Sequence, residues 1–263
     1  MPVASITSSK NPLLKEIRKA VARGTVTEAG LAVAESFHLL EEAIRSESEI
    51  AAVLAGESVS STVQARTKGL RSIQLTTIPD ALLQEIADTE TSQGVVTLVR
   101  PKSWGLHHLF RGQSLVIVLD GVQDPGNVGA ILRAAEAFGA TGALLVKGTA
   151  NPYNPKAMRA SAGSVFRLPL VAQVTPDVAV AALKQNRLEI YAAAAQGKKV
   201  IAEVDLSRRC AIVIGSEGRG VSDAFRADAV GLRIPIAQVE SLNAAMAAGI
   251  LLYEARRQRQ FKE

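Results

Sequence analysis

The stretch SLVIVLDGVQDPGNVGAILRAAEAFGATGALLVK, residues 114–147, decides the fold class. Residues 114–120 form a continuous apolar run, which is typical of a strand buried on both faces. Residues 127–139 have the apolar spacing of a helix that ends at a glycine, and residues 142–147 form a second apolar run. A strand, a helix and a strand in this order predict parallel strands joined by a crossover helix.

The same alternation continues to the end of the chain. We expect further strands at residues 167–172, 188–195, 210–215 and 231–236 and helices at 155–163, 177–186 and 241–259. This order predicts an α/β fold with a mostly parallel sheet that helices cover on both faces.

The first hundred residues predict a smaller α/β unit. Its expected strands lie at residues 31–35, 50–56 and 94–99. Residues 100–113 mix Pro, Gly, His and polar residues, so we interpret them as a linker. We therefore expect an N-terminal domain at residues 1–105 and a C-terminal domain at residues 106–263.

Length and composition exclude several classes of protein. The chain has 263 residues, 48% hydrophobic and 21% charged, which excludes a wholly disordered chain. No apolar run approaches the ~20 residues of a membrane span, and the N-terminus lacks the apolar segment of a secretory signal. The single cysteine, Cys210, cannot form an internal disulfide, and we expect it to be a buried strand residue. These features predict a cytoplasmic protein.

The net charge of +5 lies entirely in the second part of the chain. Residues 1–111 hold 12 basic and 12 acidic residues, whereas residues 112–263 hold 18 and 13. Basic residues also cluster at 10–23 and at 256–262. This balance is compatible with a nucleic-acid partner. An aromatic content of 4% argues against a platform of stacked rings for single strands.

Several kinds of active site are excluded by missing residues. All three histidines precede residue 112, which excludes a Ser-His-Asp hydrolase in the second half. Phosphate-binding P-loop and GxGxxG motifs are absent. His107 and His108 are adjacent, and we interpret them as a solvated linker pair rather than metal ligands. We expect no metal site.

Three loops follow the carboxyl ends of predicted strands, where open α/β sheets bind ligands. In the first loop, Asn127 either caps the helix or serves a function. Arg133 lies among apolar residues, so it requires an anionic ligand or a partner such as Glu136. In the second, GSEGRG, Glu217 either binds a ribose hydroxyl or pairs with Arg219.

The third loop, VESLN, precedes the last predicted helix. Ser241 is its expected N-cap. Capping and the close packing of the small residues that follow explain most of this loop without a functional role.

Taken together, the three loops resemble the SpoU (TrmH-type) family of RNA ribose 2′-O-methyltransferases of the SPOUT class. The matching stretches are DPGNVGAILRAAEAFG, IVIGSEGRGVS and IPIAQVESLNAAMAAGILLYEA, with KAMRASAGSVFRLPL between the first two. In the first half, SSKNPLLKEIRK, AESFHLLEEAI and DTETSQGVV resemble the RNA-substrate-binding domain that often precedes the catalytic one.

The resemblance implies a trefoil-knotted catalytic domain, a homodimer with the last helix in its interface, and S-adenosylmethionine as methyl donor. It implies a catalytic site built from Asn127, Arg133, Glu217, Ser241 and Asn243. It also implies donor binding by the backbone at Gly215, Ile234 and Leu242, and we include the neighbouring Ile214 and Ile236.

Arg133 would act as a base or as a bidentate clamp on a phosphate, and a guanidinium with a pKa above ~12 is a poor base.

Two departures from the family pattern stand out. Ser36 follows Glu35 where the family usually has glycine, and Ala237-Gln238 stands where a glycine is common, in a loop that looks one residue short. The resemblance predicts methyl transfer to a ribose 2′-hydroxyl of RNA, with ribosomal RNA as the leading substrate. The alternatives are transfer RNA as substrate and a non-catalytic RNA-binding relic of the fold.

Overall fold

The computed structural model describes residues 4–70 and 73–260, which form two compact units. The N-terminal unit comprises Met1–Ser103 and Asn151–Arg167, and the C-terminal unit comprises Trp104–Ala150 and Leu168–Glu263. The sequence interpretation kept 151–167 with the C-terminal domain, whereas the contacts of this segment group it with the N-terminal unit.

The N-terminal unit contains a mixed sheet with the strand order β1-β4-β3-β5-β2. Strands β1 and β3 pair in parallel with β4, whereas β5 pairs antiparallel with β3 and β2. The strands are β1 (Ala4–Ser5), β2 (Ala32–Glu35), β3 (Glu49–Gly56), β4 (Gln74–Ile78) and β5 (Val95–Arg100).

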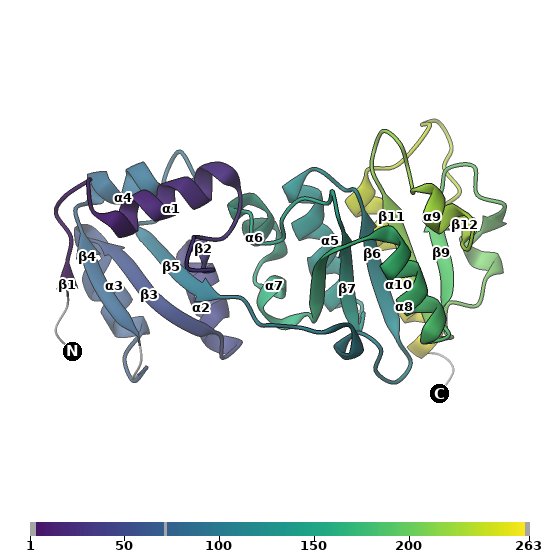
Figure 1. Ribbon diagram of the computed structural model, residues 1–263, viewed down its shortest axis with the longest axis horizontal. Helices are drawn as coiled ribbons and strands as arrows, with labels where there is room; N and C mark the ends of the chain where they lie inside the picture. Colours follow the sequence, from purple (N-terminus) through teal and green to yellow (C-terminus); the bar gives the residue numbers. More distant parts are fainter. Residues whose placement is uncertain (1–3, 71–72, 261–263) are drawn as a thin grey trace. The chain divides into compact units, whose positions relative to one another are not determined.

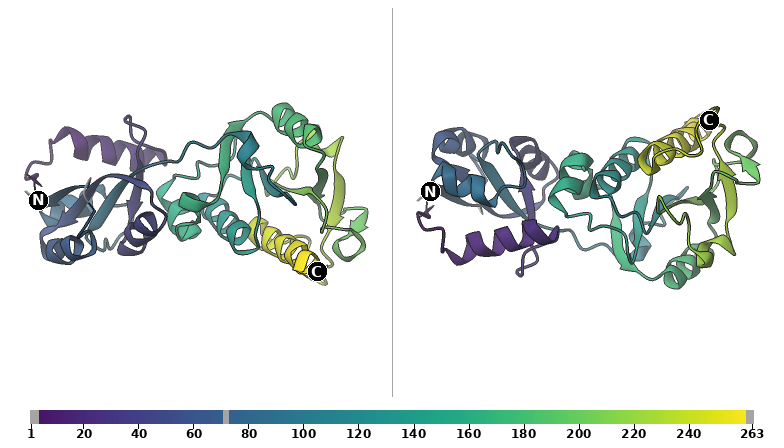
Figure 2. Two further views of the ribbon diagram at one scale, coloured as in Figure 1. Left: turned by 90° about the horizontal axis from the view of Figure 1, so that it is seen from below. Right: turned by 90° about the horizontal axis from the view of Figure 1, so that it is seen from above.

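Helices cover both faces of this sheet (Figures 1 and 2). Helices α1 and α4 pack on one face, where Leu14, Ile17 and Leu83 join a core with strand residues such as Leu54 and Val96. Helices α2 and α3 lie on the other face, and α6 contacts β2. The helices are α1 (Pro12–Arg23), α2 (Phe37–Arg45), α3 (Ser60–Arg66), α4 (Asp80–Ile86), α6 (Pro155–Ser161) and α7 (Ser164–Arg167), with a 3-10 turn η1 (Glu57–Val59).

The C-terminal unit contains the sheet that the opening stretch predicts. Its strand order is β10-β12-β9-β11-β6-β7-β8, and every pairing in the described residues is parallel. The strands are β6 (Leu115–Asp120), β7 (Gly142–Val146), β8 (Leu170–Val174), β9 (Glu189–Ala193), β10 (Lys199–Val200), β11 (Cys210–Gly215) and β12 (Val230–Arg233). The predicted α/β fold with a mostly parallel sheet is confirmed.

This sheet is buried on both faces, which explains its apolar strands. Helices α5 and α10 pack together over one face, and α8 and α9 cover the other (Figure 2). The helices are α5 (Pro125–Ala137), α8 (Pro176–Gln185), α9 (Asp223–Arg226) and α10 (Ala244–Gln260), with 3-10 turns η2 (Leu106–His108) and η3 (Ile201–Glu203). No helix in the described residues is long and apolar enough to cross a membrane.

Several element boundaries differ from the sequence prediction. The strand expected at residues 167–172 is β8 at Leu170–Val174, because helix α7 extends to Arg167. Strand β12 ends at Arg233 rather than at Ile236, because Pro235 has no N–H to donate to a ladder. Helix α10 begins at Ala244 rather than at Ser241.

The prediction for Cys210 is confirmed. It is fully buried at the start of β11, and burial raises the pKa of its thiol to about 11.

Candidate functional site

The three predicted loops leave the same edge of the C-terminal sheet. Strands β6 and β11 are neighbours, with Asp120 opposite Gly215 at their carboxyl ends, and β12 runs parallel to them. Because all these strands are parallel, the loops that follow Asp120, Gly215 and Arg233 start from one side of the sheet. The structure therefore brings together residues that lie about 90 to 116 positions apart.

Asn127 does not cap its helix. The N-cap of α5 is Asp124, whose side chain accepts a hydrogen bond from the backbone N–H of Gly126 at 3.0 Å, and Pro125 begins the helix. The Asn127 side chain instead donates from Nδ2 to Oε1 of Glu217 at 2.7 Å. The capping interpretation of Asn127 is wrong, and its side chain is committed to the neighbouring loop.

Asn243, rather than Ser241, caps α10. Its Oδ1 accepts hydrogen bonds from the backbone N–H groups of Ala245 at 2.9 Å and Met246 at 3.3 Å. Its Nδ2 donates to Oδ1 of Asn127 at 3.0 Å. One amide thus holds the helix end with its oxygen and the first loop with its nitrogen.

The three side chains form a hydrogen-bonded row with one direction. Helix N–H groups donate to Asn243, Asn243 donates to Asn127, and Asn127 donates to the carboxylate of Glu217. Hydrogen bonds in series polarise one another, so the row stabilises the negative charge of Glu217. No hydrogen bond in the described residues uses Oε2 of Glu217, which leaves that oxygen available to a ligand hydroxyl.

The alternative in which Glu217 pairs with Arg219 is not observed. No ion pair joins the two side chains in the described residues. Arg226 donates instead to the backbone carbonyl of Arg219 at 2.8 Å. Arg219 itself is exposed.

Arg133 lies apart from the row. Six residues along a helix correspond to roughly 9 Å of rise and about 120° around the axis, so Arg133 faces away from Asn127. Its side chain is exposed, and it makes no hydrogen bond or ion pair within the described residues, with Glu136 or with any other residue. The helix is apolar only on its buried side, and Arg133 lies on the exposed one.

Ser241 lies in the exposed loop before α10, and its side chain makes no hydrogen bond within the described residues. It is therefore near the row in sequence but not part of it. The small and aliphatic residues that follow, Ala244, Ala248, Leu251 and Leu252, are buried within the chain. They pack inside the unit and are not available to a second copy.

Gly215 is required by its own loop. A Cβ at this position would lie 2.2 Å from the carbonyl carbon of Gly220 and 2.3 Å from the nitrogen of Val221. Ser216 and Gly220 exchange backbone hydrogen bonds of 3.1 and 2.8 Å, which closes the turn. The close neighbour of Gly215 is therefore protein backbone of the same turn.

The remaining predicted donor-binding residues differ in accessibility. Ile214 is 2% exposed, so only its backbone can face the strand edge. Ile234 and Leu242 are half-buried, and Ile236 is 37% exposed. Ile234 and Ile236 follow β12, and Leu242 directly precedes Asn243, so these apolar residues lie in the third loop, which ends at the row.

The missing glycine of the third loop has no backbone consequence here. Neither Ala237 nor Gln238 has a positive φ. The departure at Ser36 is different, because Ser36 has φ 121°, a conformation that favours glycine. Its side chain also caps α2 by accepting a hydrogen bond from the N–H of Leu39 at 3.2 Å.

The basic clusters are partly structural. In the first, Arg18 and Lys19 pair with acidic residues. In the last helix, Arg257 pairs with Glu254 and holds the pKa of that carboxyl below its usual value. Arg259 donates to the carbonyls of neighbouring loops.

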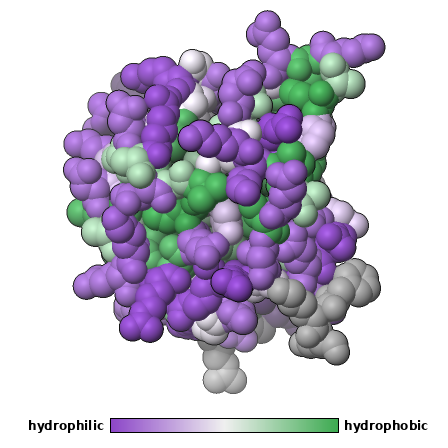
Figure 3. Space-filling model, turned by 90° about the vertical axis from the view of Figure 1, so that its right-hand side faces the viewer, coloured by the Kyte–Doolittle hydropathy of each residue, from purple (hydrophilic) through white to green (hydrophobic). Residues whose placement is uncertain are grey.

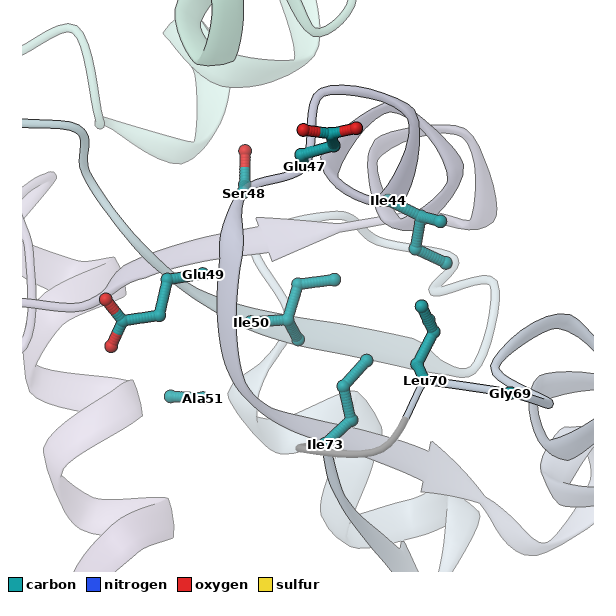
Figure 4. Close-up of a pocket in the computed structure, with 9 residues that line it drawn as sticks. All are labelled: Ile44, Glu47, Ser48, Glu49, Ile50, Ala51, Gly69, Leu70 and Ile73. Atoms are coloured by element: carbon teal, nitrogen blue, oxygen red, sulfur yellow. The ribbon is translucent and has the colours of Figure 1, made fainter.

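A separate cavity lies in the N-terminal unit. A cavity of about 610 Å³ opens between the end of α2, the start of β3 and the segment before β4. Figure 4 shows the apolar side chains of Ile44, Ile50, Leu70 and Ile73 converging on it. None of the predicted catalytic or donor-binding residues lines this cavity, so it is not the candidate site.

Sequence reasoning missed two residues that shape the strand edge. Asp120 is 6% exposed, and its Oδ2 accepts a hydrogen bond from the N–H of Ser222 at 2.7 Å. Thr149 donates to the carbonyl of Leu119 at 2.8 Å and accepts from the N–H of Gly121 at 3.0 Å. The sequence signal that could have identified Asp120 is its position as a charged residue at the end of an apolar run.

The chain thus combines an all-parallel α/β sheet, with a polar row at its carboxyl edge, and a preceding second α/β unit; in open α/β sheets this edge is where ligands bind. Comparisons with known proteins identify this class. The SpoU rRNA Methylase family model matches residues 114–253, and the MRM3-like substrate binding domain matches residues 11–97. The chain belongs to the SpoU rRNA methylase family.

Relatives that match over nearly their whole length agree with this assignment. An uncharacterized tRNA/rRNA methyltransferase of Synechocystis is 34% identical, over 97% of this chain and 94% of the relative. The 23S rRNA (guanosine(2553)-2'-O)-methyltransferase RlmP of Bacillus subtilis is 31% identical, over 95% of this chain and 98% of RlmP. The crystal structure of an AdoMet-bound rRNA methyltransferase from Sinorhizobium meliloti superposes with a TM-score of 0.85 at 29% identity, covering 97% of this chain and 98% of that one.

Proposed function

We propose that this protein transfers a methyl group from S-adenosylmethionine to a ribose 2′-hydroxyl of ribosomal RNA in the cytoplasm. The observation that carries the proposal is the row from Asn243 through Asn127 to Glu217, at the edge where this family's matching motifs meet. The names of RlmP and the Sinorhizobium meliloti enzyme support the substrate and the donor.

The residues at the strand edge fit the proposed donor. Ile236 and Leu242 supply apolar surface for an aromatic base, and the turn at Gly215 supplies backbone groups. A Cβ at Gly218 would have no atom within 4 Å, so the outer side of this turn is open. S-adenosylmethionine, when bound, supplies an electrophilic methyl group on a positively charged sulfur.

The chain's own residues would orient the attacking hydroxyl. The unused Oε2 of Glu217 accepts a hydrogen bond from the ribose hydroxyl, while Oε1 stays bound to Asn127. This fixes the hydroxyl in direction and draws its proton away from the attacking oxygen. Asn243 and Asn127 keep the carboxylate in place because each is held by the previous member of the row.

Arg133 has a place in this scheme if two copies associate. On α10, Met246 is 57% exposed, Ile250 36% and Tyr253 55%, and they recur at helical spacing on one face. Tyr253 also contacts Phe138 at the end of α5, with ring centroids 5.8 Å apart. We propose that this apolar face forms a homodimer and that the exposed Arg133 meets the RNA phosphate there, as a planar clamp.

Figure 3 shows the face of the C-terminal unit that carries β12, where hydrophobic residues are exposed among hydrophilic ones. Val230 and Val239 are 44% and 60% exposed on this unit. Exposed apolar residues around the third loop are consistent with a surface that a ligand covers.

Methylation of defined RNA tests the proposal. The purified chain is incubated with tritiated S-adenosylmethionine and either ribosomal or transfer RNA from cells that lack the protein, and modified nucleosides are mapped. We expect 2′-O-methylation of ribosomal RNA that survives EDTA and is lost in Asn127→Ala. Methylation of transfer RNA alone would favour the second substrate, a reading that the name of the Synechocystis relative also allows.

Donor binding without methylation of any RNA would identify the chain as a non-catalytic relic. Absence of donor binding would overturn the proposal. The trefoil knot and the absence of a metal requirement stay predictions.

A further inference from the structure

The carboxylate of Asp120 is buried without a cation. Asp120 is 6% exposed at the carboxyl end of β6, which lies between β11 and β7 in the sheet. No ion pair involves it within the described residues, and its Oδ2 accepts a hydrogen bond from the backbone N–H of Ser222 at 2.7 Å. Burying an unpaired carboxylate is costly. We therefore expect a buried carboxylate at the edge that carries the candidate site to have a specific role.

The backbone of Asp120 is itself held fixed. Thr149 Oγ1 donates to the carbonyl of Leu119 and accepts from the N–H of Gly121, so it contacts the residues on both sides of Asp120. Register pairing with Gly215 of β11 adds a second constraint. The backbone of Asp120 therefore has a fixed position, so its side chain can hold a loop that binds to it.

The loop attached to it is the one that carries Glu217. Residues 216–220 close on themselves through the paired hydrogen bonds of Ser216 and Gly220. Ser222 follows two residues after Gly220, and the Oγ of Ser222 is buried without a partner in the described residues. The hydrogen bond from its N–H to Asp120 therefore anchors the downstream end of the turn, and a charged acceptor makes that bond strong.

Asn127, the hydrogen-bond partner of Glu217, lies on the loop that begins after Asp120. Asn127 lies seven residues after Asp120 along the first loop. Asp120 is thus connected to both partners of the hydrogen bond between Asn127 and Glu217. The first loop connects it to Asn127, and the hydrogen bond from Ser222 connects it to the turn that carries Glu217. We propose that Asp120 is a positioning residue that sets the Glu217 loop against Asn127. This inference rests on the proposed methyltransferase function.

Two substitutions at Asp120 separate anchoring from charge. Asp120→Asn keeps an oxygen that can accept the N–H of Ser222, whereas Asp120→Ala removes it. Asp223→Ala is the matched control, because Asp223 is the next residue after Ser222. Its carboxylate is 96% exposed and, among the residues that the structure describes, pairs with Arg226 alone, at i+3. We expect Asp120→Ala to lower kcat about tenfold or more, with Asp120→Asn closer to wild type and Asp223→Ala unchanged.

A double-mutant cycle distinguishes positioning from a general structural role. If Asp120 acts through Glu217, then Asp120→Ala should reduce kcat less than about twofold in a Glu217→Ala background, because the group it positions is gone. An equal loss of kcat in both backgrounds would overturn the proposal. So would a lowered melting temperature with normal kcat in the folded fraction.

Hydrogen exchange tests the anchor without any activity. Amides of residues 216–222 should exchange faster in Asp120→Ala and stay protected in Asp120→Asn and Asp223→Ala. Unchanged protection in Asp120→Ala would overturn the anchor even if catalysis were impaired. If the unsubstituted chain methylates no RNA, the proposed function fails, and the exchange result still decides whether Asp120 holds this loop.

Discussion

Asn243 has two tasks that substitutions can separate. Its Oδ1 caps α10 through two backbone N–H groups, and its Nδ2 donates to Asn127. Asn243→Ala removes both interactions. Loss of an N-cap typically costs about 1 kcal/mol of folding free energy, which corresponds to a fall in melting temperature of about 2–4 °C for a unit of this size.

Asn243→Asp removes only the second task. A carboxylate is a good N-cap and interacts favourably with the positive end of the helix dipole, so the melting temperature should stay at the wild-type value or rise slightly. The new side chain has no N–H to donate to Asn127. Because Asn127 then loses its fixed amide orientation, we expect turnover to fall about fivefold or more, the equivalent of one lost hydrogen bond of about 1 kcal/mol.

Single-turnover methylation with tritiated donor, combined with a thermal melt, measures both quantities. The matched control is Asn11→Asp, since Asn11 caps α1 by accepting the N–H of Leu13 at 2.9 Å and has no part in the row. That control should leave turnover unchanged. If Asn243→Asp keeps wild-type turnover while Asn243→Ala loses it, then the cap alone matters and the reasoning about the hydrogen-bonded row is refuted.

Three further predictions concern the surface and the N-terminal unit. Arg133→Ala should reduce turnover about a hundredfold. The melting temperature should change little, because the side chain is exposed and unpartnered in the described residues. Arg133→Lys should stay impaired because lysine lacks the planar guanidinium, and near-normal turnover in Arg133→Ala would show that Arg133 is not part of the site. Ile250→Asp should abolish the proposed homodimer by placing a charge on the apolar face, so light scattering should report the single-chain mass, whereas an unchanged dimer would assign the interface elsewhere. The free energy of unfolding in urea should be about 1–2 kcal/mol higher for Ser36→Gly than for Ser36→Ala, because both variants lose the side-chain cap but only glycine adopts the positive φ without strain. Equal free energies of unfolding would show that the backbone at Ser36 is not strained.

The sequence by itself determined the fold class and the three loops. Apolar runs such as 114–120 and 210–215 report burial on both faces, and residues 127–139 show helical spacing. These are local properties, because the periodic spacing of apolar residues in a strand or helix can be recognised within a short segment of sequence. Element boundaries were less accurate where one residue overrides the pattern, as Pro235 does at the end of β12.

Only the tertiary structure decided which polar residues share the site. Glu217 lies 90 positions and Asn243 lies 116 positions after Asn127, and no local pattern shows that their amides and carboxylate form one row. Spacing made Asn127 a candidate cap and Ser241 another, but Asp124 and Asn243 hold those positions. Parallel strands bring the ends of distant segments to one edge, so the contacts depend on strand order and register, which arise from packing of the whole sheet rather than from any one stretch of chain.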